Sequence, residues 1–158
     1  MGNTAIAAPK SYQNIHKMET TESTNETLIR QLYEAAERQD ANLFAALFSS
    51  EGYFWDVSAG KKYYGKELGL TVDIYSAAFP DMHRELDKFY FDGDMVIVEL
   101  SLNGTHNGPL ALPSGTIEAT GREIHAPCCD VFHVRNSKVV SFHCYTAATI
   151  LLGQLGIL

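Results

Sequence analysis

The first half of the chain carries its apolar residues at helical spacing. Ser23-Thr24-Asn25-Glu26 has the form of a capping box, in which a hydroxyl and a carboxylate satisfy free backbone amides. This predicts a first helix from Ser23, a short second helix after Asp40, and a third over 66–79. Pro80 ends the third, because proline lacks an amide hydrogen. The apolar stripe of the first helix is Leu28, Leu32, Ala35 and Ala36.

The second half alternates between apolar and polar residues, which is the period of a β-strand. A tight turn at Asp92-Gly93-Asp94 and a short turn at 135–137 favour antiparallel neighbours. Pro127 interrupts one run, so a bulge or an edge is expected there. Helices followed by antiparallel strands are typical of an α+β fold, and a strongly bent sheet leaves a concave face for a ligand. The predicted strands are 53–57, 83–91, 95–106, 123–134 and 138–146.

Residues 1–22 are polar and without periodicity. They are predicted to form a flexible tail, and a partner-swapped arm is the alternative. Residues 23–158 are then long enough to form a single domain with its own core.

The formal net charge of −7 argues against nucleic acid and anionic membrane as partners, since both require a basic surface. No apolar run approaches the roughly 20 residues of a membrane span, and the N-terminus lacks the pattern of a signal peptide. The three cysteines, two of them adjacent, do not suggest a disulfide framework. Reduced thiols and a cytoplasmic location are therefore expected.

Four runs, in this order, carry a resemblance to a known family: AFPDMH (78–83), NGTHNG (103–108), DVFHVRNSKVV (130–140) and GQLGIL (153–158). Together these runs span about residues 24–158, and this part of the chain resembles a SnoaL-like polyketide cyclase (ester cyclase) of the nuclear transport factor 2-like superfamily. The resemblance implies a cone-shaped α+β barrel with a deep pocket, and a homodimer packed through the outer sheet face. It does not define the reaction, because this fold hosts several enzymes and binding proteins.

The resemblance also implies a cofactor-free ring closure, with an acidic residue on the last strand and a helping histidine on the strand before it. Aligning the hairpin on its turn puts Cys144 where the family has the acid and Asp130 where it has the histidine. The chain therefore departs from the cyclase pattern at both positions.

The residues themselves make Asp130 the main candidate. Strand alternation places Asp130 and Cys144 on facing positions of neighbouring strands, among apolar side chains. Burial would raise the pKa of Asp130 towards the range of a general base. The alternative is a carboxylate hydrogen-bonded to a helix end or a tyrosine. Cys144 is either a nucleophile or acid, or a small apolar filler.

Other side chains complete the predicted pocket. His106 is a candidate proton donor or substrate contact, and Asp56 is a second acid or a loop cap. Tyr33 either projects its hydroxyl into the cavity or packs in the core. The histidines lack a recognised ligand spacing, so neither a metal nor a cofactor is expected. The predicted substrate-binding wall is Trp55, Leu100, Phe132 and Phe142.

These residues predict a cofactor-independent acid–base enzyme, a cyclase or isomerase, that acts on an apolar oxygenated molecule such as a polyketide or terpenoid intermediate. The alternative is a non-catalytic protein of the same fold that binds a small hydrophobic ligand. A purely structural dimerisation module is a third hypothesis.

Overall fold

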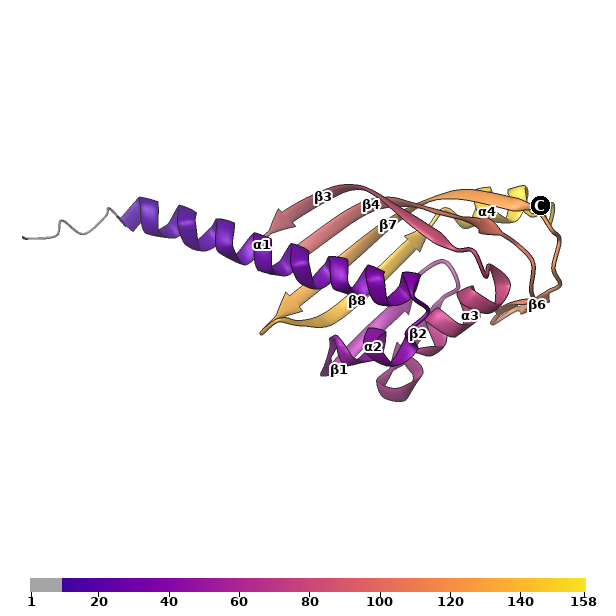
Figure 1. Ribbon diagram of the computed structural model, residues 1–158, viewed down its shortest axis with the longest axis horizontal. Helices are drawn as coiled ribbons and strands as arrows, with labels where there is room; N and C mark the ends of the chain where they lie inside the picture. The colour runs from indigo at the N-terminus through magenta and orange to yellow at the C-terminus, as the bar shows by residue number, and fades with distance from the viewer. Residues whose placement is uncertain (1–9) are drawn as a thin grey trace, which may run out of the picture.

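The computed structural model describes residues 10–158, which form helices around one side of a curled sheet (Figure 1). The helices are α1 (Lys10–Glu37), α2 (Ala41–Ala46), α3 (Leu70–Ala78) and α4 (Ala148–Gln154), with a 3₁₀ turn at Gly65–Glu67. The strands are β1 (Phe48–Asp56), β2 (Lys61–Tyr64), β3 (His83–Asp92), β4 (Met95–Thr105), β5 (Leu110–Leu112), β6 (Gly115–Ile117), β7 (Glu123–Arg135) and β8 (Lys138–Thr146).

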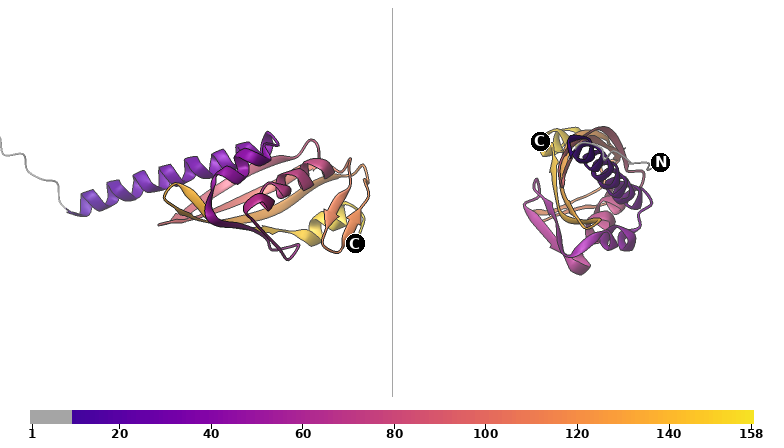
Figure 2. Two further views of the ribbon diagram at one scale, coloured as in Figure 1. Left: turned by 90° about the horizontal axis from the view of Figure 1, so that it is seen from below. Right: turned by 90° about the vertical axis from the view of Figure 1, so that its left-hand side faces the viewer.

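The main sheet has the strand order β2-β1-β8-β7-β4-β3. Only the β1–β8 pair is parallel, and the other pairs in this sheet are antiparallel. Seen end-on, the sheet bends around the helices without closing, because its edges β2 and β3 do not pair with each other (Figure 2). The predicted α+β class, with helices on a bent and mainly antiparallel sheet, is confirmed.

Helix α1 is longer than the sequence pattern predicts. It begins at Lys10, so residues 10–22 of the predicted tail are helical, and the start predicted at Ser23 is wrong. The hydroxyls of Thr21, Thr24 and Thr27 donate to carbonyls four residues earlier, which lets polar residues continue the helix instead of capping it. This part of α1 runs out beyond the sheet (Figure 1). Residues 1–9 of the predicted tail lie outside the described residues.

The connection from α2 to β1 follows the sequence in part. Asp40 caps α2 as predicted, since its side chain accepts the Leu43 amide at 2.9 Å. Gly52 lies inside β1, where the pairing with β8 shifts register. A Cβ at this position would lie 2.7 Å from the Val139 carbonyl oxygen, so the close approach of the two strands requires glycine.

Three short hairpin strands were not predicted. β2 lies between the predicted strand 53–57 and the predicted helix 66–79, and the β5–β6 pair lies between the predicted strands 95–106 and 123–134. These strands have three or four residues each, too few for a two-residue period to show.

Pro127 lies neither at a bulge nor on an edge strand, contrary to the prediction, because β4 and β7 pair continuously past it and β7 lies between β8 and β4. The Pro127 carbonyl accepts the Ala147 amide at 2.9 Å, just beyond the end of β8. Because β8 has ended there, the missing amide hydrogen of Pro127 removes no hydrogen bond between paired strands.

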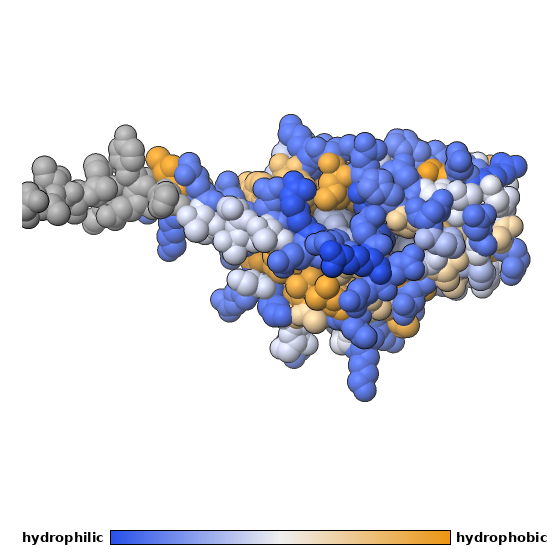
Figure 3. Space-filling view, viewed as in Figure 1, coloured by the Kyte–Doolittle hydropathy of each residue, from blue (hydrophilic) through white to orange (hydrophobic). Residues whose placement is uncertain are grey.

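The core lies between the concave face of the sheet and the helices. Residues of β7 alternate strictly, and the inward set is buried from Ile124 to Val134. Helix α1 covers this set with Ile29, Leu32 and Tyr33. Figure 3 shows a mostly hydrophilic surface, with apolar side chains gathered on both sides of α1. Asp130 is the one carboxylate on the inward face of β7, and this sets it apart from its neighbours.

Within residues 10–158, the helices lack the combination of length and apolar character that a membrane span requires.

Candidate active site

Asp130 lies at the centre of the site. It stands on the concave face of β7, pairs with Cys144 of β8, and is only 2% exposed. The Tyr33 hydroxyl donates to its Oδ2 at 2.8 Å, and the Cys128 thiol lies 3.4 Å from its Oδ1. Burial raises the pKa of Asp130 to about 6, against the opposing effect of hydrogen bonds from Tyr33, Cys144 and Cys128. A carboxyl with this pKa is poised to exchange a proton near neutral pH.

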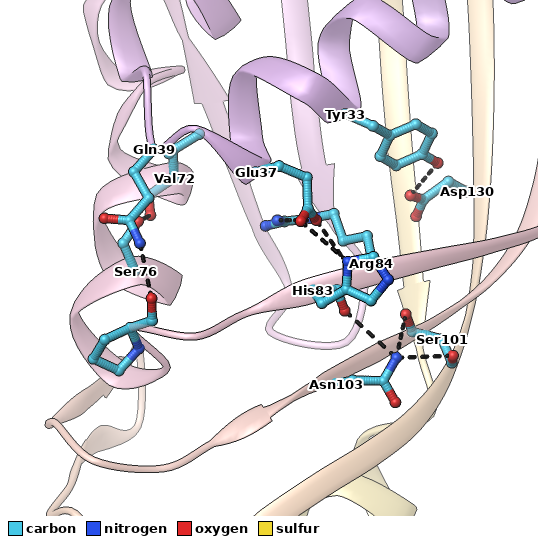
Figure 4. Close-up of polar contacts among 11 residues, drawn as sticks. Tyr33, Glu37, Gln39, Val72, Ser76, His83, Arg84, Ser101, Asn103 and Asp130 are labelled. Carbon is cyan, nitrogen blue, oxygen red and sulfur yellow. Dashed lines mark hydrogen bonds and ion pairs between the residues drawn. The ribbon is translucent and has the colours of Figure 1, made fainter.

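Tyr33 reaches Asp130 from the buried face of α1 (Figure 4). Its ring meets the edge of Phe132 at 5.9 Å between centroids. Burial, and then the charge of Asp130, raise the pKa of Tyr33 well above its usual value, so the phenol stays protonated as a donor. Asp130 therefore has the tyrosine partner that the sequence analysis gave as an alternative. Tyr33 bonds to Oδ2, and Oδ1 has no bond from it.

Two thiols flank the carboxylate. The Cys128 and Cys144 sulfurs lie 3.5 Å apart, and the Cys144 sulfur lies 3.4 Å from the Thr146 hydroxyl. The hydrogen bond to Cys128, burial and the charge of Asp130 raise the pKa of Cys144 well above its usual value. Cys144 is therefore a protonated thiol at neutral pH, which does not favour a nucleophilic role.

The same three side chains, Cys128, Asp130 and Cys144, are the one group among residues 10–158 whose ligand atoms could surround a metal ion, within 4.8 Å of one another. The Cys128 sulfur lies 3.4 Å from Oδ1 of Asp130 and 3.5 Å from the Cys144 sulfur, so we interpret the group as a hydrogen-bonded cluster.

A cavity of about 50 Å³ opens beside Asp130. Its polar wall comes from four elements: Tyr33 of α1, Tyr75 of α3, Arg84 of β3 and Asp130 of β7. Thr71 and Cys144 also line it. The rest of the wall is apolar: Ala36, Phe44, Phe54, Val72, Leu102 and Phe142.

A second, larger pocket of about 340 Å³ lies between the β5–β6 loop, α4 and the end of β1. Tyr75 lines both spaces and therefore forms a wall that they share. Asp56 lines the larger pocket and accepts the Ala59 amide at 2.9 Å, as a loop cap does. Burial raises the pKa of Asp56, while hydrogen bonds from Ala59, Tyr75 and Ser58 oppose the shift.

Trp55, one of the predicted wall residues, lies away from the cavity. Trp55 is on the outer face of the sheet, where its ring meets His143 at 5.1 Å and Lys62 lies over it. Its neighbours Phe54 and Asp56 point inward, so strand alternation already places Trp55 on the opposite face.

His106 follows β4, fully buried against the Phe79 ring. The Thr120 amide donates to its Nδ1 at 3.2 Å, which puts the ring proton on Nε2, and Nε2 has no partner among the described residues. Burial lowers the pKa of His106, so the ring is neutral. It does not line the cavity beside Asp130.

The other predicted wall residues divide between cavity and core. Phe142 lines the cavity. Phe132 and Leu100 are inward and buried, but they pack behind the wall; the Phe132 ring lies 4.3 Å from that of Phe142.

The sequence reasoning missed Arg84 and Tyr75. Arg84 lies two residues before Leu86 on β3 and so shares its inward face, which was a usable signal for an inward cation. Tyr75 lies three residues after Val72 on α3, so the two share a helix face.

A family model and solved structures relate this chain to known proteins. A family model described as a SnoaL-like domain matches residues 29–142. No curated protein matches the chain. Among solved structures, AclR, a proposed hydroxylase from Streptomyces galilaeus, is 18% identical over 86% of this chain and 87% of its own, with a TM-score of 0.72.

Two solved cyclase-like structures are similar. A proposed SnoaL-like polyketide cyclase from Jannaschia sp. CCS1 is 15% identical over 84% of this chain and 92% of its own, with a TM-score of 0.73. IdmH, a proposed polyketide cyclase from Streptomyces antibioticus, is 23% identical over 84% of this chain and 98% of its own, with a TM-score of 0.68. At these identities the likeness shows the fold, which the chain shares with proteins of different proposed reactions.

Proposed function

Because the chain belongs to the SnoaL-like domain family, we propose that it is a cofactor-independent acid–base enzyme, a cyclase or isomerase. It removes a proton next to a carbonyl group of an apolar oxygenated molecule, such as a polyketide or terpenoid intermediate. The observation that supports this most is Asp130, a carboxylate with a pKa of about 6 on the wall of an otherwise largely apolar cavity. Charged groups are rarely buried without a function or a full set of partners.

The contacts of Asp130 give its oxygens different roles. Tyr33 holds Oδ2 and so fixes the carboxylate orientation, which leaves Oδ1 beside the Cys128 thiol as the basic atom. The family acid is absent at Cys144, so the base has moved to the neighbouring strand. One acid–base group contributes roughly 10²–10⁴-fold, and positioning of the substrate supplies much of the rest.

The two spaces suggest how a substrate is held. A typical ligand site has about 300–1,000 Å³, so the inner cavity of about 50 Å³ receives only the reacting group. The pocket of about 340 Å³ beyond Tyr75 receives the apolar body, with Leu110, Leu112 and Leu151 on its wall. Binding is therefore expected to move the Tyr75 side chain.

Proton exchange tests the proposed function without knowledge of the substrate. The protein in D₂O is expected to speed deuterium incorporation next to the carbonyl of apolar ketones such as 2-tetralone and acetylacetone, measured by proton NMR. The blank is an equal amount of heat-denatured protein. Saturable binding of these ketones with exchange no faster than the blank would instead support the second candidate.

That second candidate is a non-catalytic carrier of a small hydrophobic ligand. A specific observation favours it: a protonated thiol, Cys144, occupies the position of the family acid.

We also propose a homodimer in the cytoplasm, formed through the outer face of the sheet. Exposed apolar and aromatic side chains on that face support the dimer, among them Ile97, Tyr90 and Tyr145. Sedimentation velocity should give a dimer for the wild type and a monomer for Ile97→Asp. A monomer at all protein concentrations would contradict this.

A further inference from the structure

Arg84 is a cation with few partners on the wall of the inner cavity. Its side chain is only 13% exposed, and Nη1 lies 3.5 Å from Oε1 of Glu37. A guanidinium has five N–H donors, and this long contact is the only ion pair of the Arg84 side chain within residues 10–158. The Arg84 guanidinium can therefore donate hydrogen bonds to a further oxygen ligand.

Glu37, the counter-ion of Arg84, also contacts other groups. Its carboxylate also accepts the Arg84 backbone amide at 2.7 Å and lies 3.2 Å from the His83 ring (Figure 4). Glu37 belongs to the last turn of α1, and its side chain is 32% exposed, so water weakens its hold on Arg84. Glu37 does not line the cavity, and the acid on the cavity wall is Asp130, whose charged form Arg84 favours.

We propose that Arg84 binds a delocalised oxyanion of the ligand in the inner cavity. In the reaction proposed above, that oxyanion is the enolate. The C–H bond next to the carbonyl breaks, its proton forms an O–H bond on Asp130, and the electron pair moves to the carbonyl oxygen. The negative charge thus passes from Asp130 to the ligand and stays within the field of Arg84.

The binding part of this inference does not need turnover, so it can be tested separately from the proposed function. Acetate and acetamide have the same size and shape and differ in charge. NMR titration of the ¹⁵N-labelled full chain is expected to show acetate binding at least about tenfold more tightly than acetamide, at millimolar affinity. The Arg84 side-chain Nε–H signal should shift with acetate.

Three variants make the test specific. Arg84→Met should abolish the preference for acetate, and Arg84→Lys should restore part of it. Glu37→Gln should strengthen acetate binding severalfold, because it removes the competing carboxylate. Arg38→Met is the matched control: it loses the same charge from an exposed position in the turn after α1 and should bind like the wild type.

The enolate role rests on the proposed function and has its own readout. Arg84→Met should lower kcat of ketone exchange by at least about tenfold with little change in KM, because the oxyanion exists only during the reaction. Equal binding of acetate and acetamide by the wild type would overturn the inference, whatever the exchange assay gives. Asp130→Asn should lose exchange and keep the preference for acetate, so the two proposals fail separately.

Discussion

Replacing Asp130 with asparagine is expected to lower the rate of ketone proton exchange by a factor of about 10²–10⁴. Asparagine has nearly the same shape, and its carbonyl oxygen can still accept the Tyr33 hydroxyl that now bonds to Oδ2 at 2.8 Å. It cannot take up a proton. Initial rates of deuterium incorporation, measured at the same ketone concentration for both proteins, give the ratio.

The pH dependence of exchange should identify the same group. Burial raises the pKa of Asp130 to about 6. The wild-type rate should therefore rise with pH through about 6, as the carboxyl loses its proton, and then level off. The residual rate of Asp130→Asn should lack this step.

Stability separates the loss of a base from the loss of the fold. The folded-state pKa of Asp130 is raised from 3.8 to about 6, so its contribution to stability is fully present below pH 4 and is lost as pH rises through 6. The cost of the ionised group at pH 7 is on the order of 3 kcal/mol. Urea unfolding should find Asp130→Asn at least as stable as the wild type at pH 7, and this advantage should disappear below pH 4.

An exposed carboxylate on the same sheet gives the control. Asp87 lies on β3 with an exposed side chain, so Asp87→Asn should keep the full exchange rate. An Asp130→Asn variant that is folded and exchanges as fast as the wild type would remove Asp130 as the base. A variant that is unfolded at pH 7 would contradict the assigned cost of the buried charge.

Much of the fold follows from the residues, because strand alternation and proline positions act locally. The β7–β8 hairpin pairs Asp130 with Cys144, as the sequence predicts from a short turn and a two-residue period. The nine-residue α3 ends before Pro80, also as predicted. The start of α1 was missed, since side-chain hydroxyls that cap a helix can equally bond back to its carbonyls.

The candidate site could be predicted only in part, since it combines side chains from elements that are distant in sequence. Strand alternation identified the inward face of β7, and it could have excluded Trp55. It could not show that Arg84 of β3 and Tyr75 of α3 line one cavity with Asp130. That depends on how the helices cross the curled sheet, which no local pattern records.

Phe132 supports the geometry of the site from behind, and Phe132→Ala is expected to destabilise the protein by about 3–5 kcal/mol. Its ring is fully buried, 4.3 Å from the Phe142 ring and edge-on to Tyr33. Small domains have a total stability of about 5–15 kcal/mol, so this variant should be close to unfolding. Urea unfolding followed by far-UV circular dichroism measures the loss.

A half-buried phenylalanine tests whether the destabilisation by Phe132→Ala comes from the buried position or from the loss of a ring. Phe91 lies on the edge strand β3, stacked on Phe89, and Phe91→Ala should cost clearly less than Phe132→Ala. Phe132→Leu keeps most of the volume but loses the ring edge beside Tyr33, so it should stay folded and exchange ketone protons more slowly. Equal destabilisation by the two alanine variants would contradict the larger contribution of Phe132 to packing. Full activity of Phe132→Leu would show that the Tyr33–Asp130 bond does not depend on this ring.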